Sequence, residues 1–171
     1  EFGAQELDRV LISLDEHASV FFGLFAGNDG RWGFRGQQAF LDQHGREYST
    51  LKAALELLGT HLQLIEDTIE DAGPLARRAR EIGERLGLWM EKPRKGFVYW
   101  VERRGRGCFL QATPIDVGPV LEERLFNAVD TVILTSATLA VSGNFDYAAR
   151  RLGLKHARGL VVPSHFDYRR Q

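Results

Sequence analysis

The chain has 171 residues, of which 44% are hydrophobic and 26% are charged, and its formal net charge is −1. These values are ordinary for a globular protein with a buried core. No stretch approaches the roughly 18 uninterrupted apolar residues of a membrane span, and the first 30 residues lack the order of a signal peptide. We therefore expect a cytoplasmic protein. A single cysteine, Cys108, excludes an internal disulfide and a four-thiolate iron–sulfur cluster within this segment.

The first half of the chain has the apolar spacing of amphipathic helices. From Leu7 to Phe25 the apolar residues recur every three or four positions, which predicts a first helix. The turn-forming residues 28–30 end it. A second helix is expected to begin near Gln37, or afresh at Ser49, and to run to about residue 69. Gly73-Pro74 then opens a third helix that continues to Trp89.

After Pro93 the apolar period changes from 3.6 to about two, which predicts strands. One strand is expected from Phe97 to Glu102 and another from Cys108 to Ala112, with the Gly-containing stretch 103–107 as a hairpin connector and Pro114 ending the second strand. Cys108 is expected to be buried.

The last third predicts an alternation of helix and strand. A helix is expected over 117–129 with Leu121, Leu125 and Phe126 facing inward, a buried parallel strand over 132–139, a short helix over 145–152 and a last strand over 160–162. The predicted fold class is therefore α+β, with a helical domain at residues 1–92 and a sheet-containing domain at residues 93–171.

Charge is distributed unevenly. Residues 1–73 carry a net charge of −8, residues 74–107 carry +6, and residues 108–171 carry +1. Cations interleaved with aromatic rings are typical of a track for single-stranded nucleic acid, because cations neutralise phosphates and rings stack on bases. The alternative is a solvated helix face and an ordinary hairpin tip, with the rings in the core. The candidate DNA-binding residues are Arg94, Lys95, Tyr99, Trp100, Arg103, Arg104 and Arg106.

Four ordered blocks resemble one branch of the superfamily 2 helicases, the DinG-type and XPD-type ATP-dependent DNA helicases. The blocks are 98–102 (Val-Tyr-Trp-Val-Glu), 110–116 (Leu-Gln-Ala-Thr-Pro-Ile-Asp), 135–154, which opens Thr-Ser-Ala-Thr-Leu, and 163–168 (Pro-Ser-His-Phe-Asp-Tyr). The resemblance is specific from about Phe97 onward and only architectural before it. It implies that residues 1–92 form an arch-like helical domain and residues 93–171 the C-terminal part of a RecA-like motor domain.

In the resembling helicases, a Ser-Ala-Thr element is motif III, which couples the ATP site to the DNA path. The resemblance assigns that coupling role to Thr135, Ser136, Ala137 and Thr138 and an interdomain linker to Ser164, Phe166 and Asp167. His165 stands where the family usually has proline, which puts the rigidity of the linker in doubt.

Other helicase motifs are missing from the sequence. No Walker A pattern occurs, and Asp15-Glu16-His17, which resembles a Walker B element, lies in a helical pattern and lacks a residue between Glu and His. The family's arginine-finger element is absent, no nucleophile has a recognisable base, and the five histidines show no metal spacing. We therefore expect no catalytic residue, no metal site and no ATP hydrolysis in the isolated chain.

The only methionine is Met90, and with the resemblance this suggests an excised piece of a longer helicase. The parent is expected to translocate 5′ to 3′ on single-stranded DNA in repair or replication, to use ATP and Mg²⁺, and to carry a 4Fe-4S cluster outside this segment. Single-stranded DNA, the remaining motor domains and a protein on the arch are the expected partners. The rival interpretation is a non-enzymatic helical interaction module with a supporting sheet.

Overall fold

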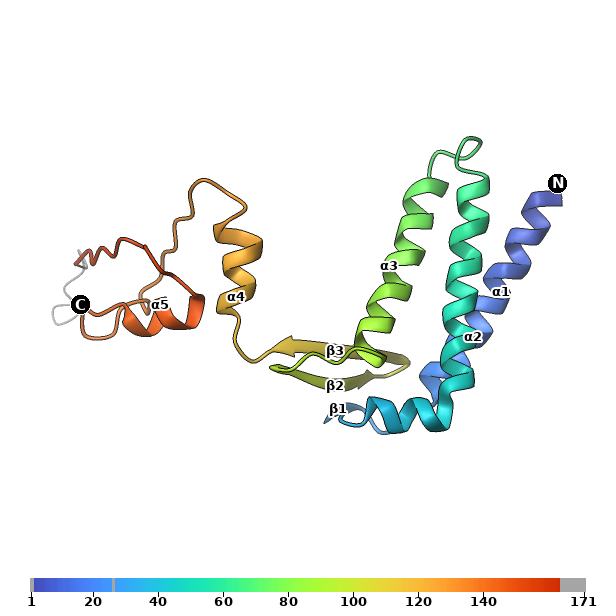
Figure 1. The fold of residues 1–171 in the computed structure, drawn as a ribbon, viewed down its shortest axis with the longest axis horizontal. Coiled ribbons are helices and arrows are strands. Elements are labelled where there is room, and N and C mark those ends of the chain that lie inside the picture. The colour runs from blue at the N-terminus through green and yellow to red at the C-terminus, as the bar shows by residue number, and fades with distance from the viewer. Residues whose placement is uncertain (1, 26, 164–171) are drawn as a thin grey trace, which may run out of the picture. The chain divides into compact units, whose positions relative to one another are not determined.

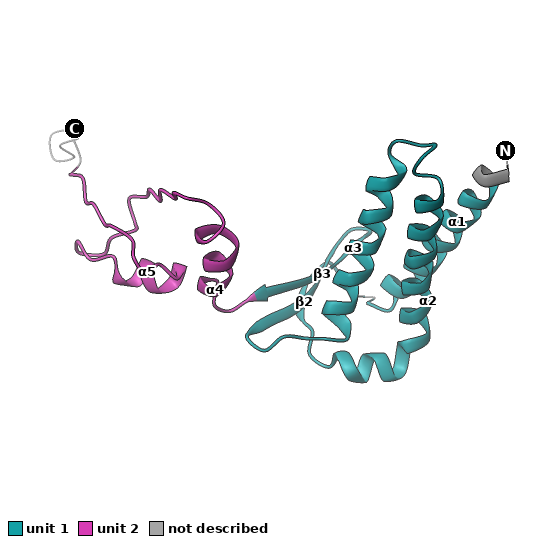
Figure 2. Cartoon of the chain, turned by 45° about the horizontal axis from the view of Figure 1, so that its top comes forward, with its two compact units in different colours: residues 1–113 teal, residues 114–171 magenta. Residues whose placement is uncertain are grey.

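A computed structural model describes residues 2–25 and 27–163 and divides the chain into two compact units. The first unit comprises residues 1–113 and the second residues 114–171 (Figures 1 and 2). The first unit combines helices with a three-stranded antiparallel sheet, which confirms the α+β prediction. The division follows residue 113 rather than residue 92, so the hairpin forms one compact unit with the helices.

Helix α1 (Phe2–Gly23) confirms the first predicted helix. Strand β1 (Gly30–Gly33) follows at the predicted turn and was not anticipated, because two of its four residues are glycines and glycine has little strand propensity. It forms by antiparallel pairing with β2, in a register that places Gly30 opposite Arg103 and Gly33 opposite Trp100.

Helix α2 (Gln37–Leu64) begins at the first of the two predicted starting points, Gln37, and continues through the second, Ser49. It begins after Gly36, whose φ of 119° suits glycine, and it kinks at His44, where φ is −125° and ψ is 25°. Helix α3 (Ala72–Met90) begins beside Gly73, as predicted. In Figure 2 the three helices lie side by side.

Small residues bring α2 and α3 close together. Ala76 is fully buried, and a Cβ added to Gly59 would lie 3.6 Å from the Ala76 carbonyl oxygen. A Cβ at Gly59 would be in ordinary contact with α3, but a side chain larger than alanine at Gly59 or Ala76 would overfill the contact between the helices. Gly59 on α2 and Ala76 on α3 therefore allow the two helices to lie close together.

The main core of the first unit joins the helices to the sheet. Its centre is aromatic, and Phe21 and Val101 are fully buried in it. A second cluster lies between the helices, around Val10, Leu58 and Ala76. Burial of these apolar side chains is the dominant stabilising contribution to the unit.

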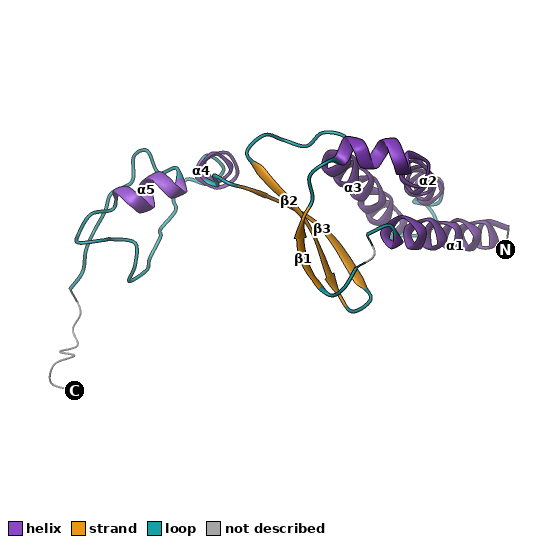
Figure 3. Ribbon diagram, turned by 90° about the horizontal axis from the view of Figure 1, so that it is seen from below, coloured by secondary structure: helices purple, strands orange, loops and turns teal. Residues whose placement is uncertain are grey.

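Strands β2 (Phe97–Arg104) and β3 (Gly107–Pro114) confirm the predicted hairpin, including its end at Pro114. Gly105 in the connector has a φ of 54°, a conformation that glycine adopts at low cost. The sheet order is β1-β2-β3, and the helices of the unit lie to one side of the strands (Figure 3).

Within its described residues, 114–163, the second unit contains three short helical elements. They are α4 (Gly118–Leu121), the π-helix η1 (Glu122–Phe126) and α5 (Asp146–Leu152). The first two replace the predicted helix over 117–129, and its three inward-facing residues are half-buried. Helix α5 confirms the helix predicted over 145–152.

Two predicted strands are wrong. Residues 132–139 and 160–162 have no strand conformation, and Ile133 and Leu160 are each 81% exposed. A buried parallel strand needs hydrogen-bonded neighbours, and within residues 115–163 the only strand-type pairing is an isolated bridge between Val141 and Asn144. The apolar run at 132–139 therefore has no neighbouring strand to pair with among the described residues of this unit.

No helix among the described residues is both long enough and apolar enough to cross a membrane.

Candidate nucleic-acid interface

The predicted DNA-binding cations lie at the two ends of β2. Arg94 and Lys95 are exposed in the loop before the strand, and Arg103, Arg104 and Arg106 lie at its end and in the hairpin connector. An eight-residue strand is about 25 Å long. The cations therefore form two groups separated by the length of β2.

The alternation of side chains along β2 places Tyr99 and Trp100 on opposite faces of the sheet. The inner face packs on the helices and carries Tyr99 and the fully buried Val101. Tyr99 stacks edge-on against Trp89 at 5.9 Å between ring centroids, and its hydroxyl accepts a hydrogen bond from the Arg94 backbone N–H at 2.8 Å. The Tyr99 ring thus holds the loop before β2 against the core.

Arg103 also belongs to the inner face. Its Nη1 donates to the Phe25 carbonyl oxygen at 3.3 Å, which ties β2 to the segment after α1. Arg103, Arg106 and Cys108 line a hollow of about 340 Å³ beside α1. Burial raises the pKa of the Cys108 thiol, and the neighbouring Arg103 charge opposes that effect only in part. Cys108 is half-buried, so its predicted burial is only partly realised.

The outer face carries an arginine–glutamate–arginine cluster that the sequence did not suggest. Glu102 Oε1 lies 2.9 Å from Arg31 Nε and 2.6 Å from Arg104 Nη2. The Glu102 side chain is only 9% exposed, whereas those of Arg31 and Arg104 are 64% and 67% exposed. The Arg31 hydrogen bond, reinforced by Arg104, holds the pKa of Glu102 below its usual range. Glu102 therefore stays ionised and fixes both arginines at the surface.

The hairpin connector is held by Asp29. Its two carboxylate oxygens accept the Gly105 backbone N–H at 3.1 and 3.0 Å. Because Asp29 directly precedes β1, this contact and the β1–β2 pairing fix the basic end of the hairpin from the same segment.

The predicted motif III residues form a small local network in the second unit. Ser136 Oγ lies 3.0 Å from Thr138 Oγ1 and accepts the Thr138 backbone N–H at 3.1 Å. Thr135, Ser136, Ala137 and Thr138 are all exposed. The linker candidates Ser164, Phe166 and Asp167 lie outside the described residues.

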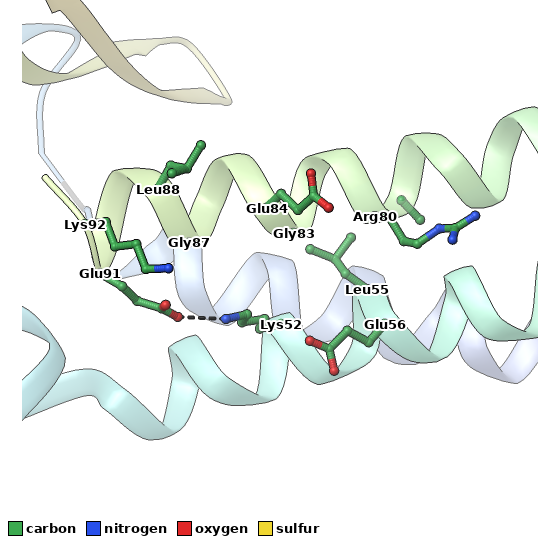
Figure 4. Close-up of a pocket in the computed structure, with 11 residues that line it drawn as sticks. Lys52, Leu55, Glu56, Arg80, Gly83, Glu84, Gly87, Leu88, Glu91 and Lys92 are labelled. Atoms are coloured by element: carbon green, nitrogen blue, oxygen red, sulfur yellow. Dashed lines mark hydrogen bonds and ion pairs between the residues drawn. The ribbon is translucent and has the colours of Figure 1, made fainter. Parts of the chain in front are cut away.

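A separate groove of about 470 Å³ lies between α2 and α3 (Figure 4). Glu91 at the end of α3 accepts hydrogen bonds from Lys52 Nζ at 2.7 Å and from the Tyr48 hydroxyl at 2.5 Å. The hydrogen bonds from Lys52 and Tyr48 lower the pKa of Glu91, whereas burial and the same carboxylate raise the pKa of Tyr48. These contacts connect the two helices.

We expect Glu91 to make the stability of the chain depend on pH below its ordinary pKa of 4.5. A carboxyl whose pKa is lowered by folding stabilises the fold above its unfolded pKa, and this contribution is lost as the pH falls through the folded value. Glu91→Gln should therefore reduce the change in unfolding free energy between about pH 7 and about pH 3, by at most about 1 kcal/mol because the site is solvent-exposed.

Urea unfolding at the two pH values measures this difference. Glu84→Gln, in the same groove, is the control and should leave it unchanged. If the unfolding free energies of the wild type and of Glu91→Gln depended on pH in the same way, Glu91 would not be the source of this pH dependence.

Within the described residues, no group of three or more His, Cys, Asp or Glu side chains could hold a metal ion.

No known protein-family profile matches the chain. Individual proteins do match it. It is 36% identical over 94 residues to the ATP-dependent DNA helicase YoaA of Escherichia coli, covering 55% of this chain and 15% of YoaA. It is 31% identical over 130 residues to YoaA of Haemophilus influenzae, covering 72% of this chain and 20% of that protein.

A third relative, DinG of Bacillus subtilis, is named a 3′-5′ exonuclease. It is 35% identical over 75 residues, covering 40% of this chain and 8% of that protein. The chain thus spans a fifth or less of the length of these relatives. It is related by sequence to a segment of the DinG-type ATP-dependent DNA helicases.

Proposed function

We propose that this chain is the segment of an ATP-dependent DNA helicase that guides single-stranded DNA and couples its path to the ATP site. The match to YoaA over 130 residues carries this proposal, because the matched proteins are helicases by name. In this proposal residues 1–92 are the arch-like domain, and residues 93–171 belong to the first RecA-like motor domain. The parent translocates 5′ to 3′.

ATP and Mg²⁺ bind outside this segment, since the chain has no Walker A pattern. One cysteine cannot provide the four thiolates of a 4Fe-4S cluster, so any cluster of the parent takes its ligands from elsewhere. The contribution of this chain is to hold the strand and to present Ser136 and Thr138 to the nucleotide-binding elements.

The exposure of residues 133–138 supports the coupling role. A segment that reports on a neighbouring site needs hydroxyl groups free to exchange partners, and Ser136 and Thr138 hydrogen-bond mainly to each other. In the parent, Walker B residues of the same motor domain are the partners that we propose for them.

Binding of single-stranded DNA tests the proposal. The chain should bind a fluorescein-labelled oligothymidylate of about 15 nucleotides at low salt, and log Kd should rise linearly with log salt concentration as counterions are released. Replacing Arg103, Arg104 and Arg106 together by alanine should weaken binding at least about 10-fold. Fluorescence anisotropy measures both effects.

The rival function is a non-enzymatic helical interaction module with a supporting sheet. A chain that is folded by circular dichroism but does not bind the oligonucleotide at low salt would favour this module and contradict the DNA guide. Digestion of the oligonucleotide would instead indicate nuclease activity, which the name of one relative suggests.

A further inference from the structure

We infer that single-stranded DNA binds on the outer face of the β1-β2-β3 sheet, with its bases on Trp100 and Phe109 and its phosphates on Arg31 and Arg104. The inference rests on the proposed function and specifies where the strand lies. Arg31 and Phe109 were not among the DNA-binding candidates that the sequence suggested.

The aromatic part of this face is identified by the strand alternation. Cys108 and Leu110 pack against the core, so Phe109 between them points outward, and it is 47% exposed. Trp100 points outward because its neighbours Tyr99 and Val101 point inward. Two rings on adjacent strands therefore lie on the face that the helices leave uncovered.

Open space adjoins the Trp100 indole. The residue paired with it on β1 is Gly33, which contributes no side chain, and a Cβ added there meets no atom within 4 Å. The indole Nε1 is shielded from solvent and has no hydrogen-bond partner among the described residues. On the β1 side of Trp100, the sheet surface is therefore not filled by a side chain from Gly33.

The arginines of the face are already ordered. Arg31 uses its Nε on Glu102 and Arg104 uses Nε and Nη2, so other N–H donors of both guanidinium groups remain directed to solvent. Because Glu102 holds the side chains in place, phosphate binding loses less conformational entropy than it would with mobile side chains. Glu102 offsets only one of the two charges, so the cluster stays positive.

Charge at both ends of β2 favours a nucleic-acid strand over an apolar partner. Arg94 and Lys95 lie at one end and the arginine cluster at the other, with Trp100 between them. A distance of about 25 Å suits several nucleotides of an extended single strand, and stacking on each ring contributes about 1–3 kcal/mol.

The 171-residue chain and the labelled oligothymidylate test this surface. Arg31→Ala with Arg104→Ala should weaken binding at least about 10-fold and lower the slope of log Kd against log salt by about 1.4, the value for two lost phosphate contacts. Phe109→Ala should weaken binding at least about 5-fold and leave the slope unchanged, because it removes stacking only.

The matched control is Arg78→Ala with Arg85→Ala. These arginines share one carboxylate, Glu81, at 3.9 and 3.6 Å on the exposed side of α3. Their loss removes the same charge from a similar cluster, and it should change Kd less than about 2-fold. Equal weakening by the two double variants would overturn the inference and leave only non-specific charge attraction.

Gly33→Val tests the same surface with a variant that should still fold. Its Cβ has room and β-branched residues favour strands, so the fold is retained while the space beside Trp100 is filled. Binding should weaken. Ultraviolet cross-linking of the wild-type complex should label peptides containing Trp100 or Phe109.

The outcomes separate this inference from the proposed function. If the wild-type chain binds no single-stranded DNA, the DNA guide fails and the inference fails with it. If the chain binds but Arg31→Ala with Arg104→Ala and Gly33→Val bind normally, or if cross-links lie only near Arg103 and Arg106, the proposed function survives and this surface is wrong.

Discussion

Phe21→Ala is expected to lower the free energy of unfolding by about 3–5 kcal/mol. Phe21 is fully buried, and its ring contacts those of Phe22 and Phe25 at 5.3 and 5.5 Å between centroids. It also lies 6.2 Å from the rings of Phe40 and Tyr48 on α2. Alanine would leave a cavity that neighbours on two helices cannot fill.

Urea unfolding followed by tryptophan fluorescence measures this loss, because all three tryptophans lie within residues 1–113. Val20→Ala is the control, since Val20 is the neighbouring residue on α1 and is 56% exposed. It should change stability by less than about 0.5 kcal/mol. A loss below about 1 kcal/mol for Phe21→Ala would show that the aromatic cluster does not hold the unit together.

Trp89→Ala is expected to cost a similar amount, about 3–5 kcal/mol, because Trp89 joins α3 to the sheet. Trp89 is 6% exposed, and its ring centroid lies 4.8 Å from that of Phe34. Its Nε1 donates to the Gln111 carbonyl oxygen at 3.0 Å. Trp89→Phe keeps most of the packing but leaves that oxygen without its donor, so a smaller loss of about 1–3 kcal/mol is expected.

Urea unfolding followed by far-ultraviolet circular dichroism compares these variants, since fluorescence itself changes when a tryptophan is removed. Leu88→Ala, one residue earlier and at a position 44% exposed, is the control. Equal stability of Trp89→Ala and Leu88→Ala would contradict the role of Trp89 in fixing the sheet on the helices.

The helices and the hairpin could be predicted from the sequence because their signals are local. Apolar periodicity determined α1 and α3, and a glycine-rich connector between alternating segments determined the hairpin. The kink at His44 explains why two starting points for α2 were both consistent with the pattern. Strand β1 was missed because its conformation depends on pairing with distant residues of β2.

The apolar run at 132–139 shows the limit of such patterns. Its composition predicts a buried strand, but burial requires neighbouring strands that residues 115–163 do not contain. The Ser-Ala-Thr element within it remains a motif III candidate on the resemblance, with Ser136 and Thr138 exposed.

The candidate site was only partly accessible from the sequence. Trp100 and Arg104 lie in the basic stretch 74–107, whereas Arg31 comes from the acidic first part of the chain and reaches the site only through the β1–β2 register. An opposite charge across a strand pair, Arg31 facing Glu102, was a signal that became readable once β1 was known. Tyr99 and Arg103 could not be assigned to the inner face until the hairpin was placed on the helices.

We propose that this chain guides single-stranded DNA. The most direct test compares the Kd of the chain for an oligonucleotide of about 15 nucleotides with its Kd for a duplex of the same length at the same low salt concentration. The single strand should bind more tightly than the duplex, because a duplex hides its bases from Trp100 and Phe109. Equal or tighter binding of the duplex would contradict it.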